Sequence, residues 1–114
     1  MSRLTLLVSM VTVTASLAFT SGCTEAVGCD FRTVEGGLNN GPEDRCQERT
    51  GVQAIGFDAA CEGLGGDAIA GGCDRDGIVF GCAIGPDVVD WHYAPTTLEE
   101  AESECGSDEI VDAP

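Results

Sequence analysis

The spacing of the cysteines is the strongest constraint on how this chain folds. Six of the seven are spread between positions 29 and 105, and no two are close enough to form a CxxC pair. Zinc sites need such close pairs so that two thiolates reach one ion, so the spacing favours disulfides instead. One small domain in 114 residues buries a limited core and gains much from cross-links. We predict no metal and no cofactor, and disulfides formed by Cys29, Cys46, Cys61, Cys73, Cys82 and Cys105.

The first 22 residues predict a signal peptide. Arg3 provides a basic start, and residues 4–19 are mostly apolar but diluted by serine and threonine. This stretch is shorter and more polar than the ~20 apolar residues of a membrane-spanning helix. Export through such a leader places the cysteines in an oxidising compartment, where disulfides persist.

The end of the leader, Thr20-Ser21-Gly22-Cys23, resembles the lipobox of bacterial lipoproteins. The resemblance implies that Cys23 is lipidated, becomes the mature N-terminus and attaches the protein to a membrane. Lipidation of Cys23 also leaves an even number of cysteines for pairing. Thr24 stands where an inner-membrane retention signal would have Asp, so the resemblance implies the outer membrane.

A second cleavage site competes with this one. Ser16 and Ala18 form the small-residue pair that ordinary signal peptidase uses, and cleavage after Ala18 would release a secreted product that retains all seven cysteines. The two interpretations differ in the fate of Cys23 and in the location of the protein.

Residues 23–52 are predicted to be a lipid-anchored tether with a loop. Glycine, asparagine and proline dominate positions 36–42, without periodic apolar residues. Residues 42–50 predict one short helix that begins with Pro42 and ends before Gly51. A disulfide between Cys29 and Cys46 is expected to hold this segment.

Two later stretches show the apolar spacing of short amphipathic helices. Residues 57–64 place apolar side chains on one stripe that includes Cys61, and glycines follow as a stop. A second helix is expected to open with Thr96 or Thr97 as its N-cap and to carry a stripe that ends at Cys105.

Between these helices the apolar residues recur with a period of two. Turn signals at 74–77 and 85–87 divide residues 67–93 into three strands of a meander. Alternation places Val79, Asp90 and His92 on the solvent face. The opposite, core-facing set comprises Ile69, Cys73, Ile78, Phe80, Cys82, Val89, Trp91 and Tyr93.

The predicted fold class is a small disulfide-rich α+β domain over residues 53–114. It is expected to be a three-stranded antiparallel meander with two short helices on one face, and a last short strand at 110–111. Cys73 and Cys82 lie diagonally in this arrangement and too far apart for a bridge. Cys61 and Cys105 are therefore each expected to bond one of these two strand cysteines, in either combination.

The charge and the reactive side chains limit the function classes. The net charge is −15 and there is no lysine, which argues against nucleic acid or an anionic lipid surface as partner. His92 is the only histidine, and serines are scarce after the leader, so we predict no enzymatic activity. The acids at Asp74 and Asp76 lack the further ligands of a calcium loop and predict a turn.

The stretch from Cys61 to Cys105 is similar to small cysteine-rich lipoproteins of Gram-negative bacteria. The shared features are Gly72-Cys73, Gly81-Cys82, an aromatic strand and a helix that ends in Cys105-Gly106. This resemblance implies no activity and no small-molecule substrate. The function predicted is a cell-envelope lipoprotein with a structural or protein-binding domain and an envelope protein as partner. The alternative is a secreted disulfide-rich inhibitor or ligand-binding module, and a small hydrolase is disfavoured.

Overall fold

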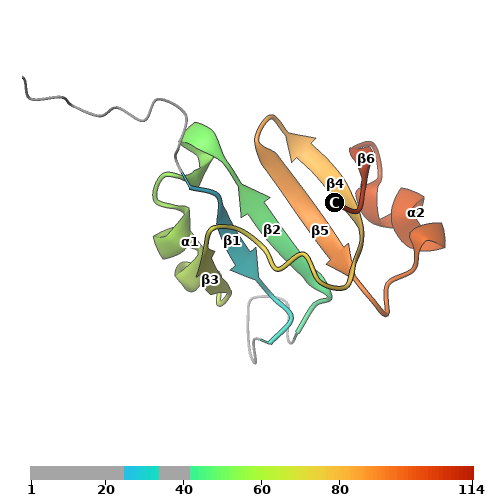
Figure 1. The fold of residues 1–114 in the computed structure, drawn as a ribbon, viewed down its shortest axis with the longest axis horizontal. Coiled ribbons are helices and arrows are strands. Elements are labelled where there is room, and N and C mark those ends of the chain that lie inside the picture. Colours follow the sequence, from blue (N-terminus) through green and yellow to red (C-terminus); the bar gives the residue numbers. More distant parts are fainter. Residues whose placement is uncertain (1–24, 34–41) are drawn as a thin grey trace, which may run out of the picture.

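The computed structural model describes residues 25–33 and 42–114. Six antiparallel strands and two short α-helices make up most of the fold (Figure 1). The predicted signal peptide, the cleavage site after Ala18, Cys23 and most of the predicted loop lie outside the described residues. The elements are β1 (Val27–Asp30), β2 (Arg45–Arg49), the 3-10 helix η1 (Gly51–Ala54), α1 (Phe57–Gly63), β3 (Asp67–Ala70), β4 (Ile78–Gly85), β5 (Val88–Tyr93), the 3-10 helix η2 (Leu98–Glu100), α2 (Ala101–Cys105) and β6 (Glu109–Asp112).

The strands follow the order β3-β1-β2-β5-β4-β6 in one sheet, so the predicted three-stranded meander is wrong. Strands β4 and β5 do form a hairpin, but β3 pairs with β1 near the other edge. Gly71 and Gly72, with φ of 88° and 104°, end β3 in a conformation that favours glycine. Residues 71–77, here called the strap, then cross the sheet before β4 begins (Figure 1).

Strand β2 occupies the position of the predicted helix at residues 42–50, and that prediction is wrong. Cys46 and Glu48 are buried while their neighbours are half-buried, which is the period of a strand. The pattern escaped detection because one of the two buried residues is an acid. Strands β1 and β2 therefore belong to the sheet, although the sequence assigns residues 23–52 to a tether.

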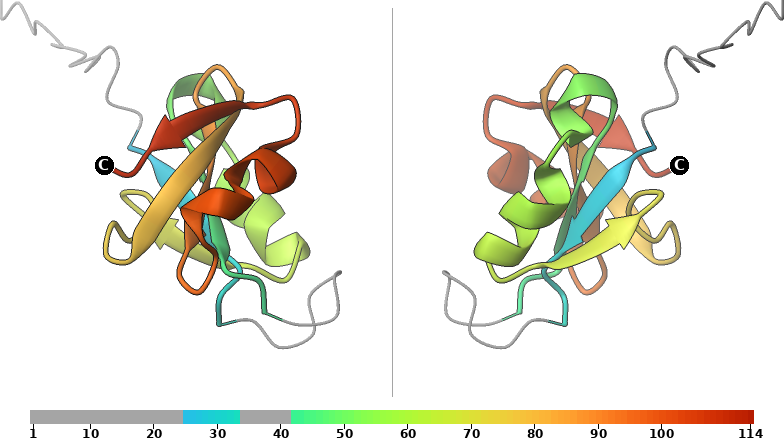
Figure 2. Two further views of the ribbon diagram at one scale, coloured as in Figure 1. Left: turned by 90° about the vertical axis from the view of Figure 1, so that its right-hand side faces the viewer. Right: turned by 90° about the vertical axis from the view of Figure 1, so that its left-hand side faces the viewer.

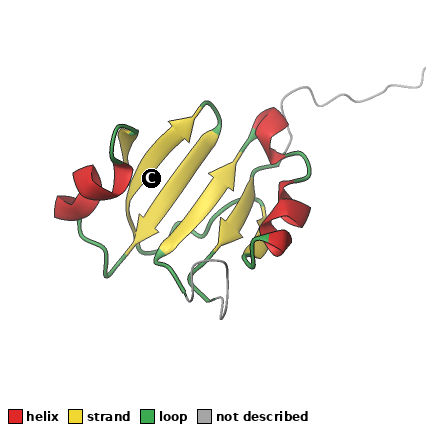
Figure 3. Cartoon of the chain, turned by 180° about the vertical axis from the view of Figure 1, so that it is seen from behind, coloured by secondary structure: helices red, strands yellow, loops and turns green. Residues whose placement is uncertain are grey.

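The two helices cover the same side of the sheet, here called the helix face, and the strap covers the other, the strap face (Figure 2). One cross-strand row contains Cys29, Gln47, Asp90 and Cys82, so these side chains point to one face. Helix α1 packs against β1 and β3, and α2 packs against β4 and β6. Strands β2 and β5 lie between the helices (Figure 3).

A register shift in β4 overturns part of the predicted core face. Ile78 pairs with Tyr93, but Phe80 pairs with His92, so the ladder skips Val79. Such a bulge moves the following side chains to the opposite face. Phe80 and Cys82 therefore pack against α2 on the helix face, whereas Trp91 and Tyr93 are buried beneath the strap.

Three disulfides join the covering segments to the strands, and each lies in its own hydrophobic cluster. The expected bond between Cys29 and Cys46 is wrong, and so is the expected bond from Cys61 to a meander cysteine. The bond of Cys105 agrees with one of the two alternatives left open. The pairs are Cys29–Cys61 between β1 and α1, Cys46–Cys73 between β2 and the strap, and Cys82–Cys105 between β4 and α2.

Disulfide mapping tests this topology. Trypsin and a glutamate-specific protease together cut between every two successive cysteines, because an arginine or glutamate separates each pair. Mass spectrometry of the non-reduced digest should yield Cys29–Cys61, Cys46–Cys73 and Cys82–Cys105 peptides. A Cys29–Cys46 peptide would contradict the sheet order.

Candidate functional site

Glu48 is the buried acid at the centre of the strap face. Its Oε1 accepts a hydrogen bond from the Cys73 backbone N–H at 2.9 Å, and its Oε2 lies 3.0 Å from Arg75 Nη2 and 3.3 Å from Trp91 Nε1. Gly28 lets the strap approach β1, because a Cβ there would lie 2.8 Å from the Cys73 nitrogen. The carboxylate thus connects the strap to the sheet beside the Cys46–Cys73 disulfide.

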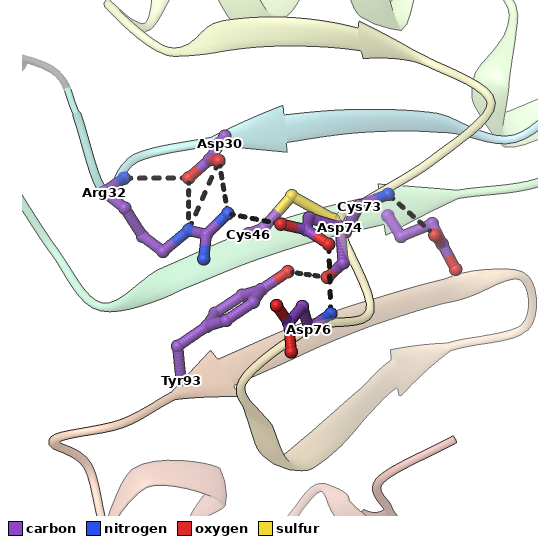
Figure 4. A network of polar contacts seen from close by, with 8 residues as sticks. Asp30, Arg32, Cys46, Cys73, Asp74, Asp76 and Tyr93 are labelled. Atoms are coloured by element: carbon purple, nitrogen blue, oxygen red, sulfur yellow. Dashed lines mark hydrogen bonds and ion pairs between the residues drawn. A yellow bond between two sulfur atoms is a disulfide. The ribbon is translucent and has the colours of Figure 1, made fainter.

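A second set of polar contacts continues this arrangement (Figure 4). Arg32 donates to both carboxylate oxygens of Asp30, and its guanidinium carbon lies 3.7 Å from the centre of the Tyr93 ring. The Tyr93 hydroxyl donates to the Asp74 carbonyl oxygen, and burial raises the pKa of that tyrosine. Asp74 Oδ1 accepts from the Asp76 backbone N–H at 3.0 Å, which closes a turn in the strap. These groups satisfy one another, so the strap face is a structural network.

We predict that Glu48→Gln destabilises the fold. The amide keeps the shape but turns an NH₂ group toward N–H donors, and a mispaired buried group costs about 2 kcal/mol. Urea unfolding with intact disulfides should show a decrease of about 2–3 kcal/mol in the free energy of unfolding.

Glu102→Gln on the exposed side of α2 provides the matched control and should stay within about 0.5 kcal/mol of the parent. Equal stability of the two variants would show that Glu48 does not hold the strap.

The helix face carries a polar ladder on the strands between the helices. Gln47 Nε2 donates to Asp90 Oδ1 at 3.0 Å, and Arg49 Nε donates to Gln47 Oε1 at 3.0 Å. Arg45 Nη1 lies 3.6 Å from the same Asp90 oxygen, and Arg45 also pairs with Glu43. The guanidinium groups therefore already have partners.

A pocket of about 360 Å³ opens at one end of this ladder. Its walls come from the start of β2, the end of β5, the following loop and helix α2. The lining side chains in the described part of the chain are all polar or charged, and acids outnumber bases among them. The lining residues are Glu43, Asp44, Arg45, His92, Thr96 and Glu104.

His92 lies in the wall of this pocket with 7% of its surface exposed. The prediction that it is an exposed strand residue is wrong, because the bulge in β4 places Phe80 beside it. The two rings stack with centroids 4.8 Å apart and 11° between their planes. Desolvation lowers the pKa of His92, while the carboxylates of Asp90 and Glu104 oppose this effect.

The remaining predicted residues fall into two groups. The six cysteines assigned to disulfides are all paired, so none of them is a thiolate available for chemistry. Cys23 lies outside the described residues, and its lipidation stays a prediction. Trp91 and Tyr93 are buried, as predicted for core residues. Sequence reasoning missed the pocket because its walls meet only through the pairing of β2 with β5.

Over residues 25–33 and 42–114, no group of three metal-ligating side chains converges. No helix in the same ranges is long and apolar enough to cross a membrane. Comparisons with protein-family models, curated proteins and solved structures find no match.

The pKa of His92 provides a direct test of the pocket. His92 is the only histidine, so the two imidazole C–H signals in a proton NMR titration both belong to it. Because burial lowers the pKa, the midpoint should fall below the ordinary value of about 6.5. As pH falls, the unfolded chain binds a proton at His92 before the folded chain does. The stability that comes from the neutral, buried His92 is therefore present above about pH 6.5 and is lost as pH falls through the lowered pKa. A midpoint at or above 6.5 would contradict the burial of the ring.

Proposed function

We propose that this protein is an envelope lipoprotein, held at the outer membrane by lipidated Cys23, whose domain has a structural or protein-binding role without catalysis. The described chain is a small domain with three disulfides. Disulfides of this density are typical of proteins outside the cytoplasm.

The pairing of the cysteines is the observation that carries the proposal. Every cysteine from Cys29 to Cys105 is bonded to another, so Cys23 has no cysteine of the same chain left to bond. An exported protein rarely keeps an unpaired thiol without a use for it. Lipidation gives Cys23 such a use.

The distribution of exposed apolar residues also supports membrane attachment. Val52 and Ile55 are 78% and 71% exposed, beside the end of the sheet where Val27 pairs with Arg49. Ile84, next to the last residue of β4, is also exposed, and the β4–β5 turn that follows lies at the same end of the sheet (Figure 1). The described chain begins at this end, two residues after Cys23, so a lipid on Cys23 would bring these side chains close to the bilayer.

Metabolic labelling with palmitate in a Gram-negative host tests the attachment. The parent protein should incorporate label and remain with the membranes, whereas Cys23→Ser should do neither. The substitution leaves the six disulfide-bonded cysteines unchanged, so the three disulfides of the variant serve as a control for folding.

An unlabelled parent with Phe19 as its mature N-terminus would overturn the lipoprotein proposal and establish the secreted alternative. Thr24→Asp sharpens the test, because the lipobox resemblance implies that this change redirects the protein to the inner membrane. Density-gradient separation of the two membranes measures the shift, with Thr24→Asn as the uncharged control.

A further inference from the structure

His92 combines deep burial with unused hydrogen-bonding capacity. Only 7% of its surface is exposed, yet within the described ranges no residue hydrogen-bonds to its ring nitrogens. Every fully enclosed side-chain nitrogen or oxygen of the described chain has a partner, so the unpartnered imidazole nitrogens are not fully enclosed, and His92 is one of the residues that line the pocket. Stacking on Phe80 fixes the plane of the ring. A side chain that is buried and oriented as a whole, with accessible and unpartnered nitrogens at the wall of a pocket, indicates a place for a ligand.

The charges around the pocket select the kind of ligand. Carboxylates approach from the start of β2 through Asp44 and from α2 through Glu104. Among the lining residues that the structure describes, Arg45 is the only lysine or arginine, and Glu43 and Asp90 already pair with it. The pocket therefore repels anions and attracts cations.

The arrangement of the lining side chains narrows the class of cation that the pocket can bind. No converging group of three metal ligands exists in residues 25–33 and 42–114, so a bare metal ion lacks the coordination it needs. A cation that carries its own N–H donors has no such requirement, because it forms separate hydrogen bonds to acceptors spread around a pocket.

We propose that this pocket binds an organic cation, an ammonium or guanidinium group, with His92 accepting a hydrogen bond and Asp44 and Glu104 supplying the counter-charge. The lowered pKa supports this role, because an unprotonated imidazole keeps one nitrogen free to accept. The hydroxyl of Thr96 offers one more acceptor in the lining. This inference does not depend on whether Cys23 is lipidated.

Two sources present such a group: a lysine or arginine side chain of a partner protein, and a free small amine. The test uses full-length protein purified in detergent with intact disulfides and without a histidine tag. The probes are acetylated, amidated Gly-Lys-Gly and Gly-Arg-Gly peptides and ethanolamine. The neutral Gly-norleucine-Gly peptide serves as control at matched ionic strength.

The cationic probes should shift the NMR signal of the His92 imidazole, and the norleucine peptide should not. Glu104→Gln should weaken binding about tenfold by calorimetry, because a charge-assisted hydrogen bond is lost. Glu102→Gln on the same helix should change affinity less than about twofold. His92→Phe keeps the stack on Phe80 but removes both nitrogens, and should weaken binding about fivefold.

Each outcome decides the proposal. Tighter binding of the basic peptides identifies a partner side chain as the ligand, and equal binding of ethanolamine identifies a free amine. Equal loss of affinity in the Glu102 and Glu104 variants, or an unmoved His92 signal, would mean that cations only associate with the acidic surface and would overturn the site. If His92→Phe fails to fold, the difference in affinity between Glu104→Gln and Glu102→Gln still tests the site.

Discussion

The three disulfides are the constraint on which the rest of this structure depends. Each joins one covering segment to one strand and lies inside its own hydrophobic cluster. Helix α2 has five residues and the strap has no regular structure, so neither offers enough apolar surface to stay on the sheet unaided. A cross-link of this kind contributes about 2–4 kcal/mol, which is comparable to the stability of a small domain.

The two faces of the sheet use their buried polar groups in opposite ways. On the strap face, the carboxylates of Glu48 and Asp30 are fully occupied by N–H donors of the same chain. On the helix face, His92 is equally buried but its ring nitrogens have no partner among the described residues. The polar groups of the strap face hold the fold together, and the unpartnered nitrogens of His92 on the helix face are free to bind a ligand.

Much of the local structure was predictable, and the errors share one cause. The helix at Phe57–Gly63, the β4–β5 hairpin and the last strand follow from apolar periodicity and turn residues. Strand β2 was not predicted because a glutamate is expected at the surface, and only the structure shows the three hydrogen-bond donors that allow Glu48 to be buried. His92 was assigned to solvent because nothing in the period of β4 reveals the skipped Val79. Each error lies where a distant segment supplies the partner.

The amino-acid sequence alone was enough to predict disulfide bonds and to place two short helices, because cysteine content and local periodicity are properties of the chain itself. Sheet order, disulfide partners and the pocket at His92 depended on tertiary structure. Cys46 and Cys73 are 27 positions apart, and their sulfurs meet only after the strap has crossed the sheet. Pairing between distant segments depends on the free energy of the whole packed domain, and no local pattern records it.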